Sequence, residues 1–164
     1  MKPINVKGRC RCARVTFVLC EEPIAFYLCH CTDCQAESGS AFGQSMAVRN
    51  GAIDGVEGPV AEHEVEGRDG RRIRISHCAN CLTHLWGATE GLPQILGLNS
   101  GSLDATSGLR PHGNMWVRSK RDWVALAPGP VYEEQPEDPL AMARAWATRP
   151  AIADRANQRW DAHS

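Results

Sequence analysis

The chain has 164 residues, with 18 lysines and arginines against 19 aspartates and glutamates and a formal net charge of −1. This length suits one domain with an ordinary hydrophobic core, and the balanced charge gives no sign of a strongly basic surface, so we expect no nucleic-acid partner. The N-terminal sequence MKPINVKGRC has no apolar run, and no segment is long and apolar enough to span a membrane, which predicts a cytoplasmic protein with no membrane association. In that compartment the eight cysteines are expected to be reduced, and those close in sequence to bind metal rather than form disulfides.

The first 58 residues predict mainly strands. Val15–Cys20 (VTFVLC) is rich in β-branched and aromatic residues, which is typical of a buried strand. Gly39 is suited to ending a helical turn, and Asn50-Gly51 is a strong turn signal. In chain order the predicted elements are strands at Val15–Cys20 and Ile24–Leu28, a helical turn at Thr32–Ser38, a strand at Ala41–Arg49 and a loop at Gly51–Gly58.

A β-hairpin is predicted next. Its strands are Glu62–Glu66 and Arg72–His77, and they flank the turn-forming segment 67–70 (GRDG). Arginines alternate with isoleucines in the second strand, which favours a solvent-exposed strand face over a phosphate-binding patch. The later predicted elements are strands at Leu82–Ala88 and Gln94–Leu98, a turn at Asn99–Asp104, and short strands at Trp116–Val117 and Trp123–Leu126.

The chain changes character after residue 127. Four prolines between residues 128 and 139 predict an irregular passage. Asp138 and Pro139 suit the N-cap and first position of a helix at Leu140–Ala147, and Ile152–Trp160 is a candidate for a second helix. We therefore expect a β domain at residues 1–127 and a peripheral C-terminal tail at residues 128–164 that packs on it.

Seven of the eight cysteines fall into three close groups. These are C-x-C at Cys10 and Cys12, C-x-C-x-x-C at Cys29, Cys31 and Cys34, and C-x-x-C at Cys78 and Cys81. Such spacing is typical of zinc ligands, and the C-x-x-C motif at the end of a hairpin has the form of a zinc knuckle. The remaining thiol, Cys20, has no close cysteine neighbour and is interpreted as a packed free thiol.

The grouping of these ligands into sites leaves alternatives open. The two pairs together supply four sulfurs, which completes a tetrahedral zinc site and leaves the triplet with three sulfurs and an open fourth position. An open coordination position allows a metal to bind a substrate and take part in catalysis. In another partition Cys78 completes the triplet, and the triplet can also belong to an ordinary closed structural site. We prefer the first partition because it uses each local group whole.

The order and spacing of these motifs resemble those of a known family. The motifs are GRCRC at residues 8–12, CHCTDCQAESGSAF at residues 29–42, CANC at residues 78–81 and GSLD at residues 101–104. Over about residues 5 to 127 the chain is similar to the glutathione-dependent formaldehyde-activating enzymes, a family that also includes centromere protein V. Two positions depart from the family pattern: Leu82 stands where glycine is usual, and His77 stands where an aromatic residue is usual.

The resemblance implies a fold, cofactors and an activity. The fold is mainly β, a zinc-clamped β-tent of small antiparallel sheets, here with a short irregular or helical C-terminal tail. Two zinc ions per chain are implied: a structural zinc held by Cys10, Cys12, Cys78 and Cys81, and a catalytic zinc held by Cys29, Cys31 and Cys34. The implied activity is that of a carbon–sulfur lyase of the S-(hydroxymethyl)glutathione synthase type, which joins glutathione or a similar thiol to formaldehyde or a related aldehyde. The alternative is a non-catalytic zinc module that binds a thiol or a protein partner.

Several residues near the cysteines have weaker claims to a role. We expect His30, which lies between two cysteines, to face solvent or to support the ligands from outside. His84 lies three residues after Cys81, but two cysteine pairs already complete that site, so we do not expect it to bind the metal. Asp104 is interpreted as a turn former. Residues 38–40 (SGS) either offer hydroxyls and amides to a substrate or simply shape the loop.

Overall fold

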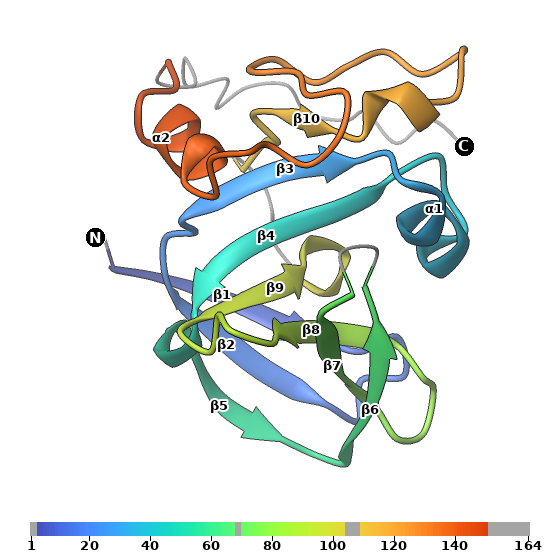
Figure 1. Ribbon diagram of the computed structural model, residues 1–164. Helices are drawn as coiled ribbons and strands as arrows, with labels where there is room; N and C mark the ends of the chain where they lie inside the picture. Colours follow the sequence, from blue (N-terminus) through green and yellow to red (C-terminus); the bar gives the residue numbers. More distant parts are fainter. Residues whose placement is uncertain (1–2, 68–69, 104–108, 151–164) are drawn as a thin grey trace, which may run out of the picture.

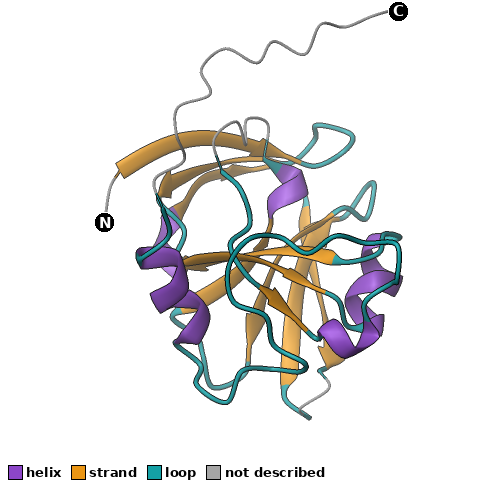
Figure 2. Ribbon diagram, turned by 90° about the horizontal axis from the view of Figure 1, so that it is seen from above, coloured by secondary structure: helices purple, strands orange, loops and turns teal. Residues whose placement is uncertain are grey.

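A computed structural model describes residues 3–67, 70–103 and 109–150 of the chain. The described residues form two β-sheets with short helices beside them (Figures 1 and 2). The mainly β fold class predicted from the sequence is confirmed, together with cysteine clusters that have the composition to clamp zinc. None of the described helices is long and apolar enough to cross a membrane.

The smaller sheet has three antiparallel strands in the order β1-β2-β5. They are β1 (Pro3–Arg9), β2 (Thr16–Glu21) and β5 (Ile53–Glu57). The prediction of a loop at Gly51–Gly58 is therefore wrong. Its glycines and polar residues indicated a loop, but the edge of β2 supplies a hydrogen-bonding partner, with Leu19 opposite Ile53.

The larger sheet has seven strands in the order β10-β3-β4-β9-β8-β7-β6. Neighbouring strands are antiparallel except for β10, which runs parallel to β3. The predicted hairpin is confirmed as β6 and β7, and the other long strands appear within a few residues of their predicted positions. The strands are β3 (Ala25–Cys29), β4 (Gly43–Arg49), β6 (Val60–Glu66), β7 (Arg72–Cys78), β8 (His84–Thr89), β9 (Ile95–Asn99) and β10 (Asn114–Met115).

The helices are short. Helix α1 (Thr32–Ser38) begins at the cysteine triplet and ends at Gly39, whose φ of 62° is left-handed, as the sequence predicted. Helix α2 (Ala141–Ala147) confirms the predicted tail helix, but its N-cap is Leu140 and not the predicted Asp138. The Asp138 carboxylate still accepts from the Leu140 amide just before the first turn. Three 3₁₀ turns lie at Asn50–Ala52, Ser100–Ser102 and Val117–Ser119.

The last part of the β domain differs from its prediction. The Trp116–Val117 segment is not a strand, because Trp116 has a φ of 60° and leads into a 3₁₀ turn. The Trp123–Leu126 segment is not one either, and Trp123 is 79% exposed. Aromatic residues suggested buried strands at both places, but the strand that forms is the short β10 just before them. The second predicted helix, at residues 152–160, lies outside the described residues.

The hydrophobic core fills the space between the two sheets. Phe17 of β2 and Trp86 of β8 meet edge to face, with their ring centroids 5.5 Å apart. Gly8 of β1 lies against the Phe17 ring so closely that a Cβ atom there would come within 2.3 Å of it. The close packing of β1 on Phe17 therefore requires glycine at this position. The largest fully buried side chains around this contact include Leu19, Met46, Val48, Leu85 and Leu98.

The chain after residue 127 packs on β3. Trp146 of α2 contacts Phe26 with ring centroids 6.2 Å apart, and both side chains are buried. The backbone of Asn114 in β10 bonds to Pro130 and Tyr132, which fastens this segment beside the larger sheet. Figure 1 shows α2 and β10 on the same side of β3. The division into a domain at residues 1–127 and a tail at residues 128–164 stays a prediction.

Candidate metal centres

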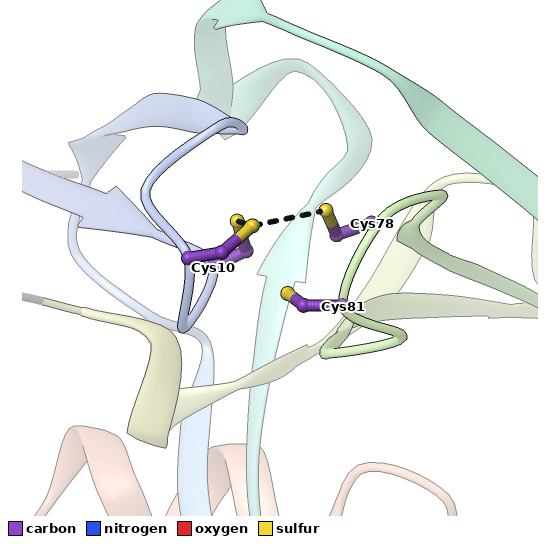
Figure 3. A group of neighbouring side chains, drawn as sticks. Cys10, Cys78 and Cys81 are labelled. Atoms are coloured by element: carbon purple, nitrogen blue, oxygen red, sulfur yellow. Dashed lines mark hydrogen bonds between the residues drawn. The ribbon is translucent and has the colours of Figure 1, made fainter.

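The two cysteine pairs come together from different sheets. Cys10 and Cys12 lie in the turn between β1 and β2, whereas Cys78 ends β7 and Cys81 follows it in the next turn. Their four sulfur atoms lie within 4.8 Å of one another. Figure 3 shows Cys10, Cys78 and Cys81 pointing toward a common centre. Cys10 and Cys78 are fully buried, so this centre is part of the core at the junction of the sheets.

Backbone turns aim these sulfurs. In the first turn the Cys10 Sγ accepts from the Val15 amide at 3.3 Å. In the second turn the Leu82 amide donates to the Cys78 carbonyl at 2.9 Å, which brings Cys81 back toward Cys78. This tight reversal requires a φ of 60° at Leu82, a left-handed conformation that is costly for a branched residue. Glycine, which the resemblance leads one to expect there, adopts it without strain.

The polar surroundings favour thiolate at part of this centre. The Thr83 hydroxyl lies 3.2 Å from the Cys81 Sγ, and this hydrogen bond lowers the pKa of Cys81 to about 5. The Asn80 amide nitrogen lies 3.4 Å from the Cys12 Sγ. Burial raises the pKa of the Cys78 thiol, which loses contact with water. A cation bound among the four sulfurs would compensate that cost of burying negative charge.

The cysteine triplet lies in one short segment of the larger sheet. Cys29 ends β3, Cys31 is the N-cap of α1, and Cys34 lies in its first turn. The Cys31 Sγ accepts from the Cys34 amide at 3.4 Å, so the sulfur itself caps the helix. The three sulfur atoms lie within 4.8 Å of one another. Gly43 of β4 allows this approach, because a Cβ atom there would come within 3.0 Å of the Cys34 side chain.

Hydrogen bonds in the triplet favour one thiolate. Donation from the Cys29 and Cys34 thiols, assisted by the amides of Cys34 and Asp33, lowers the pKa of Cys31 well below its usual value. The same contact with Cys31 raises the pKa of Cys29 to about 12, and Cys34 shifts in the same direction. Without metal, these hydrogen bonds therefore favour the thiolate at Cys31 over the thiolates at Cys29 and Cys34.

Both groups of sulfurs fit zinc. Two sulfurs bound to one tetrahedral zinc are about 3.8 Å apart, given zinc–sulfur bonds of about 2.3 Å. In the four-cysteine group the Cys10–Cys12 and Cys12–Cys78 sulfur pairs are 3.5 and 3.9 Å apart. The pairs would complete a tetrahedral site, whereas the triplet offers three donors and no fourth side chain among the described His, Cys, Asp and Glu residues. The structure thus brings the seven cysteines together in the preferred grouping, and Cys78 does not join the triplet.

His30 is buried behind the triplet. It has no exposed surface, and its Nε2 lies 3.3 Å from the Asn114 Oδ1. Of the two placements expected for His30, the solvent-facing one is therefore wrong, and a role in supporting the ligands from outside stays a prediction. Burial lowers its pKa, which favours the neutral ring. The Gln35 side chain donates to the carbonyls of His30 (2.7 Å) and Ser119 (2.9 Å). These bonds join the start of α1 to the 3₁₀ turn that ends at Ser119.

Two features near the triplet carried no signal in the sequence. Tyr27, paired with Ser45 of β4, is half-buried, and its pKa is raised by desolvation and by the nearby Cys29 and Cys34. Glu37, one turn after Cys34, makes a 2.6 Å contact with the His84 Nδ1. Neither residue belongs to a cysteine motif. Their places near the triplet become visible only from the β3–β4 ladder and from the side-chain contact between α1 and β8. His84 does not join the four-cysteine centre, as expected.

Residues 38–40 shape the loop after α1. The Ser38 hydroxyl lies 2.6 Å from the Cys34 carbonyl and 3.1 Å from the Phe42 carbonyl, and it accepts from the Ser40 amide. These contacts occupy the Ser38 hydroxyl, which favours the loop-shaping role of this residue over a contact with substrate. Cys20 is a free thiol that donates to the Ala52 carbonyl at 3.1 Å. Asp104 lies outside the described residues.

Comparison with known proteins gave one family match. A family model described as glutathione-dependent formaldehyde-activating enzyme matches residues 5–119. No curated protein matches the chain. Among solved structures, a Rhodobacter sphaeroides protein is similar over 76% of this chain and 98% of its own, with 18% identity and a TM-score of 0.46.

Proposed function

Because the chain belongs to the family of glutathione-dependent formaldehyde-activating enzymes, we propose that it is a zinc-dependent carbon–sulfur lyase. It reversibly joins a thiol such as glutathione to formaldehyde or a related aldehyde, in the cytoplasm. The observation that carries this proposal is the separation of the seven cysteines into a group of four and a group of three. A group of four thiolates leaves no position on zinc for a substrate, and a group of three leaves one.

The residue roles in this proposal follow from the two groups. Cys10, Cys12, Cys78 and Cys81 hold a structural zinc, and Cys29, Cys31 and Cys34 hold the catalytic one. Zinc at the triplet supplies a positive charge that favours the thiolate form of a substrate thiol and draws electrons from an aldehyde oxygen. Three thiolate ligands already offset the charge of the metal, so holding the thiol is its larger contribution.

The reaction is the addition of a thiol to an aldehyde carbonyl, with the transfer of one proton. The thiol sulfur loses its proton and uses a lone pair to form a bond to the aldehyde carbon. The carbonyl π electrons move to oxygen, which takes a proton and becomes the hydroxyl of the hydroxymethyl thioether. The reverse reaction breaks the carbon–sulfur bond. The protein therefore has to hold the sulfur and the carbonyl carbon together and to move one proton between sulfur and oxygen.

The experiment is turnover by the purified zinc-loaded protein. Glutathione, cysteine and a thiol without a peptide are each mixed with formaldehyde, and exchange between free and hydroxymethylated thiol is followed by NMR. We expect acceleration over the uncatalysed exchange with at least one thiol, and loss of it in Cys31→Ser. The matched control is Cys20→Ala, which removes a thiol outside both centres and keeps the rate. Absence of acceleration with every thiol and aldehyde tested contradicts the proposal and favours the non-catalytic module.

A further inference from the structure

We propose that Glu37 and His84 form the proton-transfer pair of the reaction at the triplet, with His84 exchanging the proton and Glu37 orienting its ring. This inference rests on the proposed function and names further residues that carry it out. The pair joins two elements of the fold, since Glu37 belongs to α1 and His84 begins β8.

The contact between the two side chains fixes which nitrogen of His84 is available. The Nδ1 lies 2.6 Å from the Glu37 Oε1, so Nδ1 carries a proton and donates it to the carboxylate. In the neutral ring the Nε2 is then the atom with a free lone pair. A base oriented by a neighbouring carboxylate is the usual arrangement around an activated nucleophile.

The Nε2 of His84 is buried and has no hydrogen-bond partner among the described residues. Buried polar atoms in folded proteins nearly always have a partner, which is often a water molecule or a ligand. The His84 side chain is 24% exposed, but this exposure lies on atoms other than Nε2, whose own surface is covered. A substrate therefore reaches the unsatisfied Nε2 only when the groups that cover it move aside.

Glu37 connects this imidazole to the triplet. It lies three residues after Cys34 on α1, and residues at this spacing lie on the same side of a helix. The negative charge of the Cys31 thiolate opposes ionisation of Glu37 to a small extent. The bulge in the ladder between β7 and β8 sets His84 opposite His77, so that its side chain meets α1.

The surroundings of Glu37 favour its ionised form at neutral pH. The hydrogen bond from His84 lowers the pKa of Glu37, and this effect exceeds the opposing effects of burial and the Cys31 thiolate. Glu37 is therefore ionised at pH 7. The other titratable neighbours are His77 of β7 and His63 of β6, whose Nδ1 atoms lie 3.2 Å apart and hydrogen-bond to each other. These two rings pair with each other, and the Nε2 of His84 stays free.

The pair supplies the step that the reaction requires. The His84 Nε2 accepts the proton of the substrate thiol as its sulfur attacks the aldehyde carbon, and the resulting imidazolium is stabilised by the Glu37 carboxylate. The imidazolium then returns that proton to the oxygen that received the carbonyl electrons. One proton moves from sulfur to oxygen, and both side chains end in their starting forms.

The first test is kinetic. In His84→Gln we expect kcat/KM to fall about 100-fold or more, with the zinc content unchanged, as is usual when a general base is lost. Wild-type kcat/KM should also show an acidic limb in its pH profile, as is usual for a general base, and this limb should vanish in the variant. Glu37→Gln should lower the rate and move the limb. His112→Gln and Glu66→Gln, which change a histidine and a glutamate outside the pair, are the matched controls and should behave like wild type.

The second test does not depend on turnover. In ¹⁵N-labelled protein, NMR should show His84 protonated at Nδ1, and glutathione should shift the resonance of its Nε2. Two results would contradict the pair in a wild type that is active: an Nε2 resonance that glutathione does not shift, or an acidic limb that is still present in His84→Gln. In either case the pair does not carry the proton, and the proposed function stands. If the wild type turns over no thiol, the proposed function fails. An Nε2-protonated ring, or one that no thiol perturbs, then contradicts the pair as well.

Discussion

At the scale of single residues, the cysteines differ in what surrounds them. Cys78 is fully buried at the junction of the two sheets, and its thiol has a raised pKa because of that burial. Cys31 is the N-cap of α1, and hydrogen bonds from neighbouring thiols and amides lower its pKa. The Cys20 thiol donates to the backbone carbonyls of Gly51 and Ala52. The same residue type therefore has a different consequence when it is changed at each of these positions.

Replacement of Cys78 and Cys31 by serine should separate the two centres. Cys78→Ser should unfold or severely destabilise the protein, because a structural zinc contributes directly to the free energy of folding. Cys31→Ser should leave a folded protein with one zinc. Zinc content and thermal unfolding measure both effects, and Cys31→Ser unfolding as readily as Cys78→Ser would mean that the ligand roles are assigned wrongly.

Replacement of Cys20 by alanine should have a small effect. The change removes a half-buried sulfur and its hydrogen bond to the Ala52 carbonyl, which predicts a loss of about 1 kcal/mol in the free energy of unfolding. Both zinc ions should remain. Denaturant unfolding and metal analysis check this prediction, and a variant with only one zinc contradicts it.

At the scale of elements, the turn between β7 and β8 contains a strained residue. Leu82 has a φ of 60°, its side chain is 72% exposed, and its amide closes the turn that aims Cys81. A left-handed conformation costs a branched residue roughly 1–2 kcal/mol, and the exposed side chain contributes little burial in return. The turn keeps its shape because the sulfurs and the two strands hold both of its ends.

Replacement of Leu82 by glycine should stabilise the protein. Relief of the strain outweighs the greater freedom of glycine in the unfolded chain, so we expect a gain of up to about 1 kcal/mol and a rise in Tm of about 2–4 °C. Leu82→Ala is the control, because it removes the same exposed side chain and keeps the strained conformation. A rise in Tm of equal size in Leu82→Ala would show that the side chain, and not the backbone, is responsible.

The sequence predicted most of the long strands, α1 with its glycine end, and the grouping of the cysteines, because these depend on local patterns. It missed β1 and also β5, whose only support is the edge of β2, and it misplaced the segment around Trp116. The burial of His30 and the pairing of Glu37 with His84 depend on contacts between residues far apart in the chain. Such contacts leave no periodicity or spacing for a single sequence to reveal.

At the scale of the whole molecule, the two centres have different places in the fold. The four-cysteine centre takes one pair of sulfurs from the turn β1–β2 of the smaller sheet and the other from the turn β7–β8 of the larger sheet. A metal there closes a long loop and ties the sheets together. The triplet lies within one segment that runs from β3 into α1, so its metal can be lost or exchanged while the sheets remain joined (Figure 1).

A substrate thiol should enter the triplet and leave the four-cysteine centre unchanged. Cobalt bound at both centres in place of zinc reports each one through its thiolate-to-metal absorption, and Cys31→Ser identifies the bands of the triplet. Glutathione should change only those bands, and S-methylglutathione, which has no ionisable thiol, should not. Equal responses to the two compounds would mean that the peptide binds away from the metal, and a response in the bands of the four-cysteine centre alone would mean that the open position lies there.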